Sequence, residues 1–209
     1  PGKVASQIVK FVMEEAPNWH IICDGGDASV WMDDFSISTY PGQVIRWGPL
    51  GTIGTGNGFG LGAYFADGNP AVIFTGDGSF GFHAMEFDTY VRHKVPVICV
   101  ISNDSAWGMI RNNEISLHPE DYRKYGSIGT GLPHMTAYHK LAEIWGGIGI
   151  AVNRYEDVIP AMRKIKESGL PGIVNVEVDD KPLSRPILNA AKMREAARKA
   201  GKKHAGVYG

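Results

Sequence analysis

Apolar runs of strand length recur along the 209 residues and alternate with longer segments of mixed polar and apolar character. Six runs predict strands over His20–Cys23, Gln43–Arg46, Ala71–Phe74, Val97–Ile101, Gly149–Val152 and Ile173–Val178. The segments between them predict helices over Val4–Glu15, Thr55–Phe65, Phe82–Arg92, Met135–Trp145, Tyr155–Glu167 and Asn189–Lys199. This alternation is typical of an α/β fold, a doubly wound and mostly parallel sheet of about six strands with helices on both faces. The stretch Asn112–Pro133 lacks clear periodicity and predicts a long loop, or a loop with short helices.

The composition indicates one domain with one sizeable core. Hydrophobic residues make up 44% of the chain and charged residues 21%. A net charge of −1 gives no general attraction to nucleic acid or membranes, and the longest apolar stretches are too short to span a bilayer. Cys23 and Cys99 lie in apolar strands, so we expect buried thiols rather than a disulfide. Together with the lack of a visible secretory signal, this predicts a cytoplasmic protein.

The turn Gly76-Asp77-Gly78-Ser79 carries the strongest chemical signal. It follows a buried strand, at the end where open α/β sheets bind ligands, and Asn103 follows the next strand, with 24 residues between Gly78 and Asn103. A magnesium ion needs few protein ligands when a substrate adds phosphate oxygens, and Asp77 and Asn103 would supply a carboxylate and an amide. Gly78 and Ser79 can direct backbone N–H groups at a phosphate. The alternative is an ordinary strand–turn–helix with Asp77 as its N-cap, and the spaced Asn103 disfavours it.

This spacing resembles the diphosphate-binding domain of the thiamine-diphosphate (ThDP) enzymes over roughly residues 3–180. Within that superfamily the segments Asp24–Asp27 and Glu86–Ile98 are most similar to the acetolactate-synthase-like group, which includes 2-hydroxyacyl-CoA lyases. The resemblance implies ThDP and Mg²⁺ as cofactors. It also implies a diphosphate-binding domain over residues 1–186, followed by a basic tail over 187–209.

The resemblance further assigns roles to individual residues. The metal ligands would be the side chains of Asp77 and Asn103 and the backbone carbonyl of Ser105. Ile53 would wedge between the two rings of ThDP, and the Gly51 carbonyl would accept a hydrogen bond from the aminopyrimidine. Further cofactor contacts are expected from Asp27, Ala28, Thr52, Gly76, Gly78, Ser79, Trp107, Gly108 and Met109.

Some of these assignments have plain alternatives. Ile53, Trp107 and Met109 could be ordinary core residues. Asp27 would be repelled by a diphosphate unless it were protonated or linked to the metal, and the alternative is that it points at a hydroxyl or at a partner chain.

Glycines alternate at Gly56, Gly58, Gly60 and Gly62 within a predicted helix. Each costs about 1 kcal/mol relative to alanine in a helix interior, so a closely packed neighbour is needed to offset them. In the ThDP enzymes that neighbour would be a helix at a subunit interface.

The glutamate that activates ThDP belongs, in this superfamily, to a separate pyrimidine-binding domain that the sequence does not contain. We therefore expect either a larger partner subunit, in a hetero-oligomer built on dimers, or a longer polypeptide. The leading hypothesis is the small subunit of a carbon–carbon lyase or carboligase acting on 2-hydroxyacyl-CoA, with the basic tail near the CoA phosphates. One alternative is a 2-oxoacid decarboxylase or an acetolactate-type synthase, and another is a non-catalytic ThDP-binding regulatory subunit. The tail itself could also be a solvated helix with a frayed end.

Overall fold

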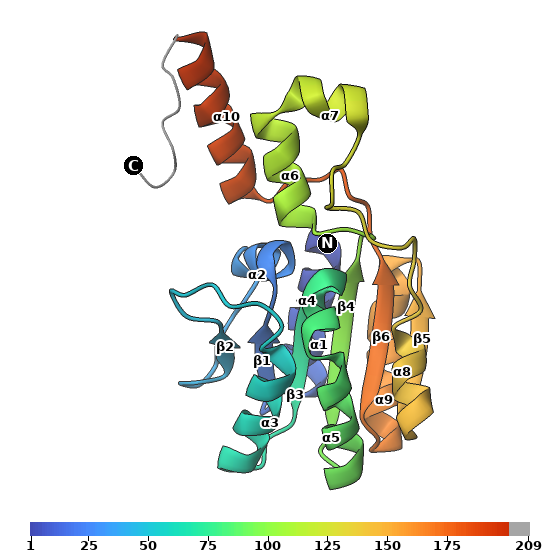
Figure 1. Cartoon of the computed structure of the whole chain (residues 1–209). Helices are drawn as coiled ribbons and strands as arrows, with labels where there is room; N and C mark the ends of the chain where they lie inside the picture. Colours follow the sequence, from blue (N-terminus) through green and yellow to red (C-terminus); the bar gives the residue numbers. More distant parts are fainter. Residues whose placement is uncertain (201–209) are drawn as a thin grey trace.

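Six parallel strands form the central sheet (Figure 1). The computed structural model describes residues 1–200. Its strands are β1 (His20–Cys23), β2 (Val44–Arg46), β3 (Ala71–Gly76), β4 (Val97–Asn103), β5 (Ile148–Val152) and β6 (Gly172–Glu177). They are arranged in the order β2-β1-β3-β4-β6-β5, and every pairing is parallel. The predicted fold class is therefore confirmed.

Helices cover both faces of the sheet (Figure 1). One face carries α1 (Gly2–Glu15), α2 (Gly26–Asp33) and α9 (Val158–Ser168), and the other carries α3 (Gly56–Asp67), α4 (Asp77–Phe82), α5 (Phe87–His93) and α8 (His139–Trp145). Because side chains alternate along a strand, Ile21 and Val72 join the first core, whereas Ile22 and Ile73 join the second. Both faces are thus buried, which explains why the strands are almost uniformly apolar.

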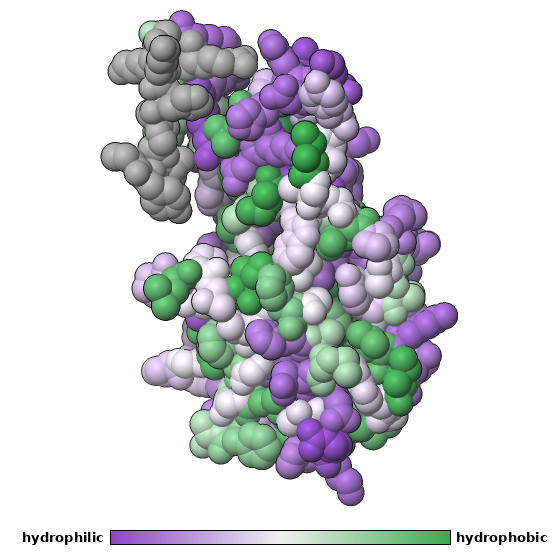
Figure 2. Space-filling model, in the orientation of Figure 1, coloured by the Kyte–Doolittle hydropathy of each residue, from purple (hydrophilic) through white to green (hydrophobic). Residues whose placement is uncertain are grey.

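A third group of helices lies beyond the carboxyl ends of the strands. It consists of α6 (Gly108–Leu117), α7 (Pro119–Tyr125) and α10 (Arg185–Lys199). α10 packs against α6, where Arg194 Nη1 donates a hydrogen bond to Asn113 Oδ1 at 2.9 Å. Figure 2 shows that a notch on the left side of the view sets this group off from the body of the molecule.

Three helical regions differ from the sequence-based expectation. The segment predicted as one helix over Phe82–Arg92 is divided into α4, a 3-10 turn (Ala84–Glu86) and α5. The helix predicted from Met135 begins only at His139, because Met135 has a left-handed backbone (φ 47°) that cannot continue a right-handed helix. α2 was not predicted, since it is eight residues long and follows two glycines.

The sheet reverses its direction of growth between β1 and β3. β1 is followed by β2 on one side, whereas β3 pairs on the other side and continues toward β4. The chain then leaves β1 into α2 and β3 into α4, which lie on opposite faces. A crevice at the carboxyl ends of these two strands is the usual ligand site of such folds.

The alternating glycines of α3 serve two different purposes. A Cβ at Gly56 would lie 2.8 Å from Asp24 Cβ, and one at Gly60 would overlap Tyr90 Oη, so both glycines are required by packing inside the domain. Gly58 and Gly62 have no such neighbour within 4 Å and are exposed. The expectation that all four lie at a subunit interface is therefore wrong for Gly56 and Gly60, and it stays a prediction for the other two.

The structure bears on two expectations drawn from composition, one about the cysteines and one about membrane-spanning segments. Cys23 and Cys99 are free and buried, and burial raises the pKa of the Cys23 thiol to about 12. Within residues 1–200, no helix combines the length and apolar character needed to cross a membrane.

The two classes of glycine predict opposite effects of alanine on stability. Gly60→Ala should lower the free energy of unfolding by about 1–3 kcal/mol, because the methyl group has no space beside Tyr90. Gly62→Ala should leave it unchanged or raise it by up to about 1 kcal/mol, because the position is open and alanine favours helix. Urea denaturation of the two variants measures the difference, and an equal loss in both would show that Gly62 is also packed.

Candidate functional site

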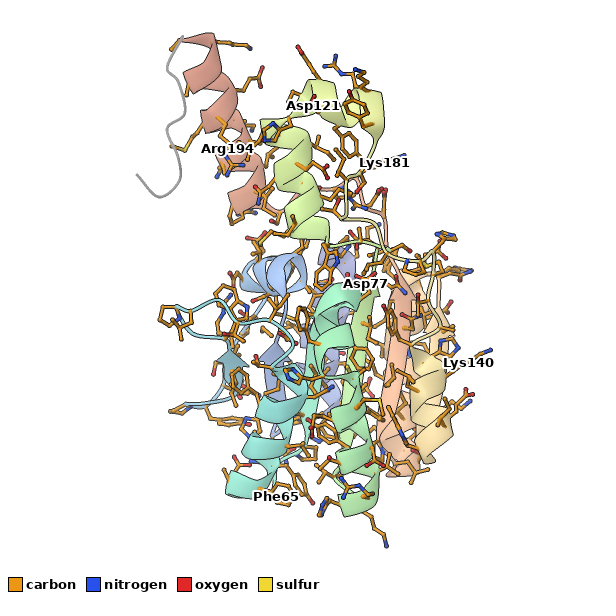
Figure 3. The ribbon with its side chains drawn as sticks, in the orientation of Figure 1. Phe65, Asp77, Asp121, Lys140, Lys181 and Arg194 are labelled. Atoms are coloured by element: carbon orange, nitrogen blue, oxygen red, sulfur yellow. The ribbon has the colours of Figure 1, made fainter. Side chains whose placement is uncertain are left out.

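Asp77 lies in the crevice, at the end of β3 and the start of α4 (Figure 3). Asp77 is 2% exposed. Oδ1 accepts a hydrogen bond from the Gly78 N–H at 2.9 Å, whereas Oδ2 is buried and has no hydrogen-bond partner among the described residues. Burial, followed by the charge of Asp104, raises the pKa of Asp77 to about 7. A buried carboxylate oxygen without a partner is costly, and a cation would remove that cost.

Asp104 lines the same pocket as Asp77. Its Oδ2 accepts a hydrogen bond from Arg111 Nη2 at 2.8 Å, and Arg111 also reaches Asp180 at 3.4 Å. Burial raises the pKa of Asp104, and the Arg111 guanidinium offsets part of that increase. Asp77 and Asp104 therefore face one pocket, and Arg111, which does not line that pocket, pairs with Asp104.

The structure does not bring Asn103 or Ser105 into this pocket. Asn103 is fully buried. Its Oδ1 accepts the Ser105 N–H at 3.1 Å, and its Nδ2 donates to Asn175 Oδ1 at 3.1 Å and to the Thr136 carbonyl at 3.2 Å. The Ser105 carbonyl accepts the Leu132 N–H at 2.8 Å. Asn103 thus connects β4 to β6, and Asp104 and Ala106 line the pocket in place of the predicted pair.

Glycines bring the backbone of three loops together around the pocket. A Cβ at Gly25 would lie 2.6 Å from Ser79 Oγ, and one at Gly78 would lie 2.7 Å from the Trp107 ring. The loops after β1, β3 and β4 therefore touch one another only because these positions lack side chains. Of the predicted cofactor contacts, the structure gathers Asp27, Ala28, Gly76, Gly78, Ser79, Trp107, Gly108 and Met109 around one pocket of about 470 Å³.

Asp27 opens α2 and faces the same pocket. Its Oδ1 is buried without a partner among the described residues, and its Oδ2 accepts a hydrogen bond from Asn112 Nδ2 at 3.4 Å. Burial, with a smaller contribution from Asp104, raises the pKa of Asp27 to about 6. Asp27 therefore holds its proton more tightly than an exposed aspartate does, and a nearby anion would raise its pKa further.

The segment after β2 forms the mouth of the pocket. Gly51 and Ile53 line it, whereas the predicted contact Thr52 does not. Gly51 has a left-handed backbone (φ 64°), and Leu50 is 93% exposed. Trp47 and Pro49 are further lining residues that the sequence did not single out, because their positions depend on how this irregular segment folds back over the sheet.

Comparison with known proteins identifies the family. The model for "Thiamine pyrophosphate enzyme, C-terminal TPP binding domain" matches residues 24–176. The chain belongs to the thiamine pyrophosphate enzyme family. Thiamine pyrophosphate is another name for ThDP, so the predicted family is confirmed. The match begins at Asp24 and covers β3 and β4, the strands that Asp77 and Asp104 follow.

Curated relatives and a solved structure extend this result. The acetolactate synthase large subunit IlvG of Mycobacterium tuberculosis is 35% identical over 180 residues, which cover 86% of this chain and 31% of that protein. Human 2-hydroxyacyl-CoA lyase 2 is 33% identical over 181 residues, covering 81% and 27% respectively. Benzoylformate decarboxylase from Polynucleobacter necessarius shares the fold, with a TM-score of 0.71 at 19% identity over 88% of this chain and 34% of that one. The chain thus spans less than a third of the length of these two curated relatives.

The raised pKa of Asp77 predicts a pH dependence of stability in the metal-free chain. A carboxyl group whose pKa rises on folding, here from 3.8 to about 7, binds its proton more tightly in the folded state. The folded state should therefore lose stability as the pH rises from about 4 to about 7. Thermal unfolding in EDTA at pH 5 and pH 7.5 should show a larger decrease in Tm for the wild type than for Asp77→Asn.

Asp34→Asn is the matched control, because it removes an exposed carboxylate. It should retain the wild-type decrease. If Asp77→Asn also retained that decrease, Asp77 would not be the titrating group.

Proposed function

We propose that this chain is the ThDP-binding part of a carbon–carbon lyase or carboligase that acts on 2-hydroxyacyl-CoA. The observation that carries the proposal is the buried Asp77 beside Asp104, with its Oδ2 unpartnered among the described residues, in a glycine-lined crevice of a thiamine pyrophosphate enzyme domain. The similarity to proteins named 2-hydroxyacyl-CoA lyase 2 supports the substrate class.

The pocket fits a divalent cation with a diphosphate. Two carboxylates offer the oxygen ligands that Mg²⁺ prefers, and the diphosphate would complete its coordination. We propose Asp77 and Asp104 as side-chain ligands, with the backbone carbonyl of Ala106 as the third, since the Ser105 carbonyl already accepts a hydrogen bond from Leu132. Among residues 1–200, no cluster of three or more His, Cys, Asp or Glu side chains forms a metal site. This is consistent with an ion held jointly by protein and cofactor.

The remaining pocket residues would bind and orient the cofactor. Gly78 and Ser79 would direct N–H groups at the diphosphate, and protonated Asp27 would donate a hydrogen bond to it. Ile53 would separate the two rings, and the Gly51 carbonyl would accept a hydrogen bond from the aminopyrimidine. When bound, ThDP supplies a carbon nucleophile and an electron sink, while Trp107 and Met109 would exclude water around its reactive carbon.

The activating glutamate would come from elsewhere. The chain covers less than a third of the relatives named above, and that supports a pyrimidine-binding partner subunit or a longer polypeptide. We propose a hetero-oligomer built on dimers, and a cytoplasmic location based on the two unpaired, buried cysteines.

A second candidate is an acetolactate-type synthase or a 2-oxoacid decarboxylase. The 35% identity to proteins named acetolactate synthase supports this second candidate as directly as the similarity to the lyases supports the first candidate. A regulatory subunit without catalytic activity is less well supported, because the pocket retains the acidic pair and Ile53.

The ligand assignment predicts different effects of substituting the adjacent residues Asn103 and Asp104. Asp77→Ala should abolish Mg²⁺-dependent ThDP binding, and Asp104→Ala should weaken it at least about tenfold, a change of about 1.4 kcal/mol. Asn103→Ala should instead destabilise the fold, because Asn175 and Thr136 lose their hydrogen-bond partner. Calorimetry with ThDP and Mg²⁺, paired with thermal unfolding, separates these effects. Loss of Mg²⁺ dependence in Asn103→Ala but not in Asp104→Ala would restore the ligand set predicted from the sequence.

The CoA proposal predicts a selective effect of the basic tail. Each charge-assisted contact to a phosphate is worth about 1.5–3 kcal/mol, so truncation after Arg185 should raise KM for a 2-hydroxyacyl-CoA roughly tenfold or more. The steady-state kinetics of the complete enzyme should be measured with a 2-hydroxyacyl-CoA and, for comparison, with a free 2-oxoacid. Equal use of both substrates, or turnover of the free acid only, would reject the lyase in favour of the second candidate. Lys202 and Lys203 of the tail lie outside the described residues.

A further inference from the structure

Asp24 directly follows β1 and is 2% exposed, yet it does not line the pocket. Its Oδ1 accepts the N–H groups of Gly25 at 2.6 Å and Gly54 at 2.9 Å. Its Oδ2 accepts the Gly56 N–H at 3.1 Å and the Thr75 hydroxyl at 3.3 Å. One carboxylate therefore joins β1 and β3 to the segment that forms the mouth of the pocket.

The Asp24 carboxylate also caps the N-terminus of α3, in place of a residue that is adjacent in the sequence. α3 begins at Gly56, and neither Thr55 nor an acidic residue in the first turn caps it. The Thr55 hydroxyl is buried and has no hydrogen-bond partner within the described residues. Asp24, from a distant strand, accepts the first N–H group of the helix and places a negative charge at its N-terminus, where the helix dipole favours it.

Gly54 is held at its carbonyl as well as at its N–H. His83 Nδ1 lies 2.7 Å from the Gly54 carbonyl oxygen, so this ring nitrogen is the donor. Gly54 has a φ of 82°, and a Cβ there would lie 2.5 Å from Phe82 Cβ. Gly54 is thus fixed by Asp24 at its N–H, by His83 at its carbonyl, and by close packing against α4.

We propose that Asp24 and His83 are positioning residues that fix Gly54 and thereby set Gly51 and Ile53 at the mouth of the pocket. The link to ThDP rests on the proposed function, in which Gly51 and Ile53 contact the aminopyrimidine. Neither Asp24 nor His83 lines the pocket, so each acts through the backbone of the 51–56 segment. Burial raises the pKa of Asp24, and the Gly56, Gly25 and Gly54 N–H groups offset part of that increase.

Both oxygens of Asp24 accept hydrogen bonds, which makes Asp24→Asn informative. An asparagine can keep its oxygen toward Gly25 and Gly54, but its NH₂ group then faces the Gly56 N–H. The Gly56 amide should lose its acceptor while the Gly54 amide retains one.

Amide hydrogen exchange in the full 209-residue chain tests the contacts without any ligand. Asp24→Asn should accelerate exchange at Gly56 roughly tenfold, and His83→Ala should accelerate it at Gly54 by roughly three- to tenfold. Amides of β4 should exchange at the wild-type rate in both variants. His83 is exposed, so its variant should fold even if Asp24→Asn does not. Unchanged exchange at Gly54 in His83→Ala would overturn the proposal.

Thr75→Val is the matched control. It removes one hydrogen bond to Asp24 but leaves the Gly54 and Gly56 amides partnered. Exchange at both amides should stay at the wild-type rate. Faster exchange in this variant would mean that general loss of packing around Asp24, rather than the two amide contacts, controls the segment.

Calorimetry on the complete protein tests the consequence for the cofactor. His83→Ala should raise the Kd for ThDP roughly three- to tenfold and leave the Kd for Mg²⁺ alone unchanged. Equal ThDP affinity in the variant and the wild type would overturn the positioning role. If the wild type did not bind ThDP, the proposed function would fail, whereas the exchange experiment would still decide whether Asp24 and His83 hold the segment.

Discussion

The pocket depends on buried negative charge that the protein leaves incompletely compensated. Asp77, Asp104 and Asp27 face the same space, and Arg111 pairs with Asp104. Removing carboxylates from water without a counter-charge is costly, so the metal-free protein reduces the cost by holding protons more tightly, as the raised pKa values of Asp77 and Asp27 show. A divalent cation would supply the missing positive charge, and it would also make the pocket acceptable to a diphosphate.

Two aspartates that follow neighbouring strands differ in their role. One holds the backbone around the pocket, and the other has an oxygen available to a ligand. Asp24 follows β1 and accepts four hydrogen bonds from the protein, so it organises the loops around the pocket. Asp77 lies immediately after β3, and one of its oxygens has no partner among residues 1–200. The same residue type at the same edge of the sheet is saturated in one case and left free for a ligand in the other. The difference arises because the α3 N-terminus faces Asp24 and not Asp77.

The sequence predicts well those features that depend on local pattern. Most strands are short apolar runs, and the turn at Asp77 is recognisable because a Gly-Asp-Gly sequence follows a buried strand. It predicts poorly what depends on orientation. Asn103 and Asp104 are adjacent oxygen-bearing residues, and a shift of one residue at the end of a strand changes the face on which a side chain lies. Likewise, the distinction between Gly60 and Gly62 depends on Tyr90, which is distant in the sequence.

The nearly equal similarity to acetolactate synthases and 2-hydroxyacyl-CoA lyases follows from what this domain does. Most of the pocket residues discussed above would hold the cation, the diphosphate or the aminopyrimidine, and these demands are the same in both reactions because ThDP supplies the chemistry. Substrate choice must then depend on groups beyond the cofactor, at the mouth of the pocket. In this chain the pocket lining includes two such exposed apolar side chains, Leu50 at 93% and Ile110 at 57%. Because these two side chains are apolar, contact with the hydrocarbon part of a substrate would remove them from water, whereas any phosphates of the substrate would have to be bound by other groups.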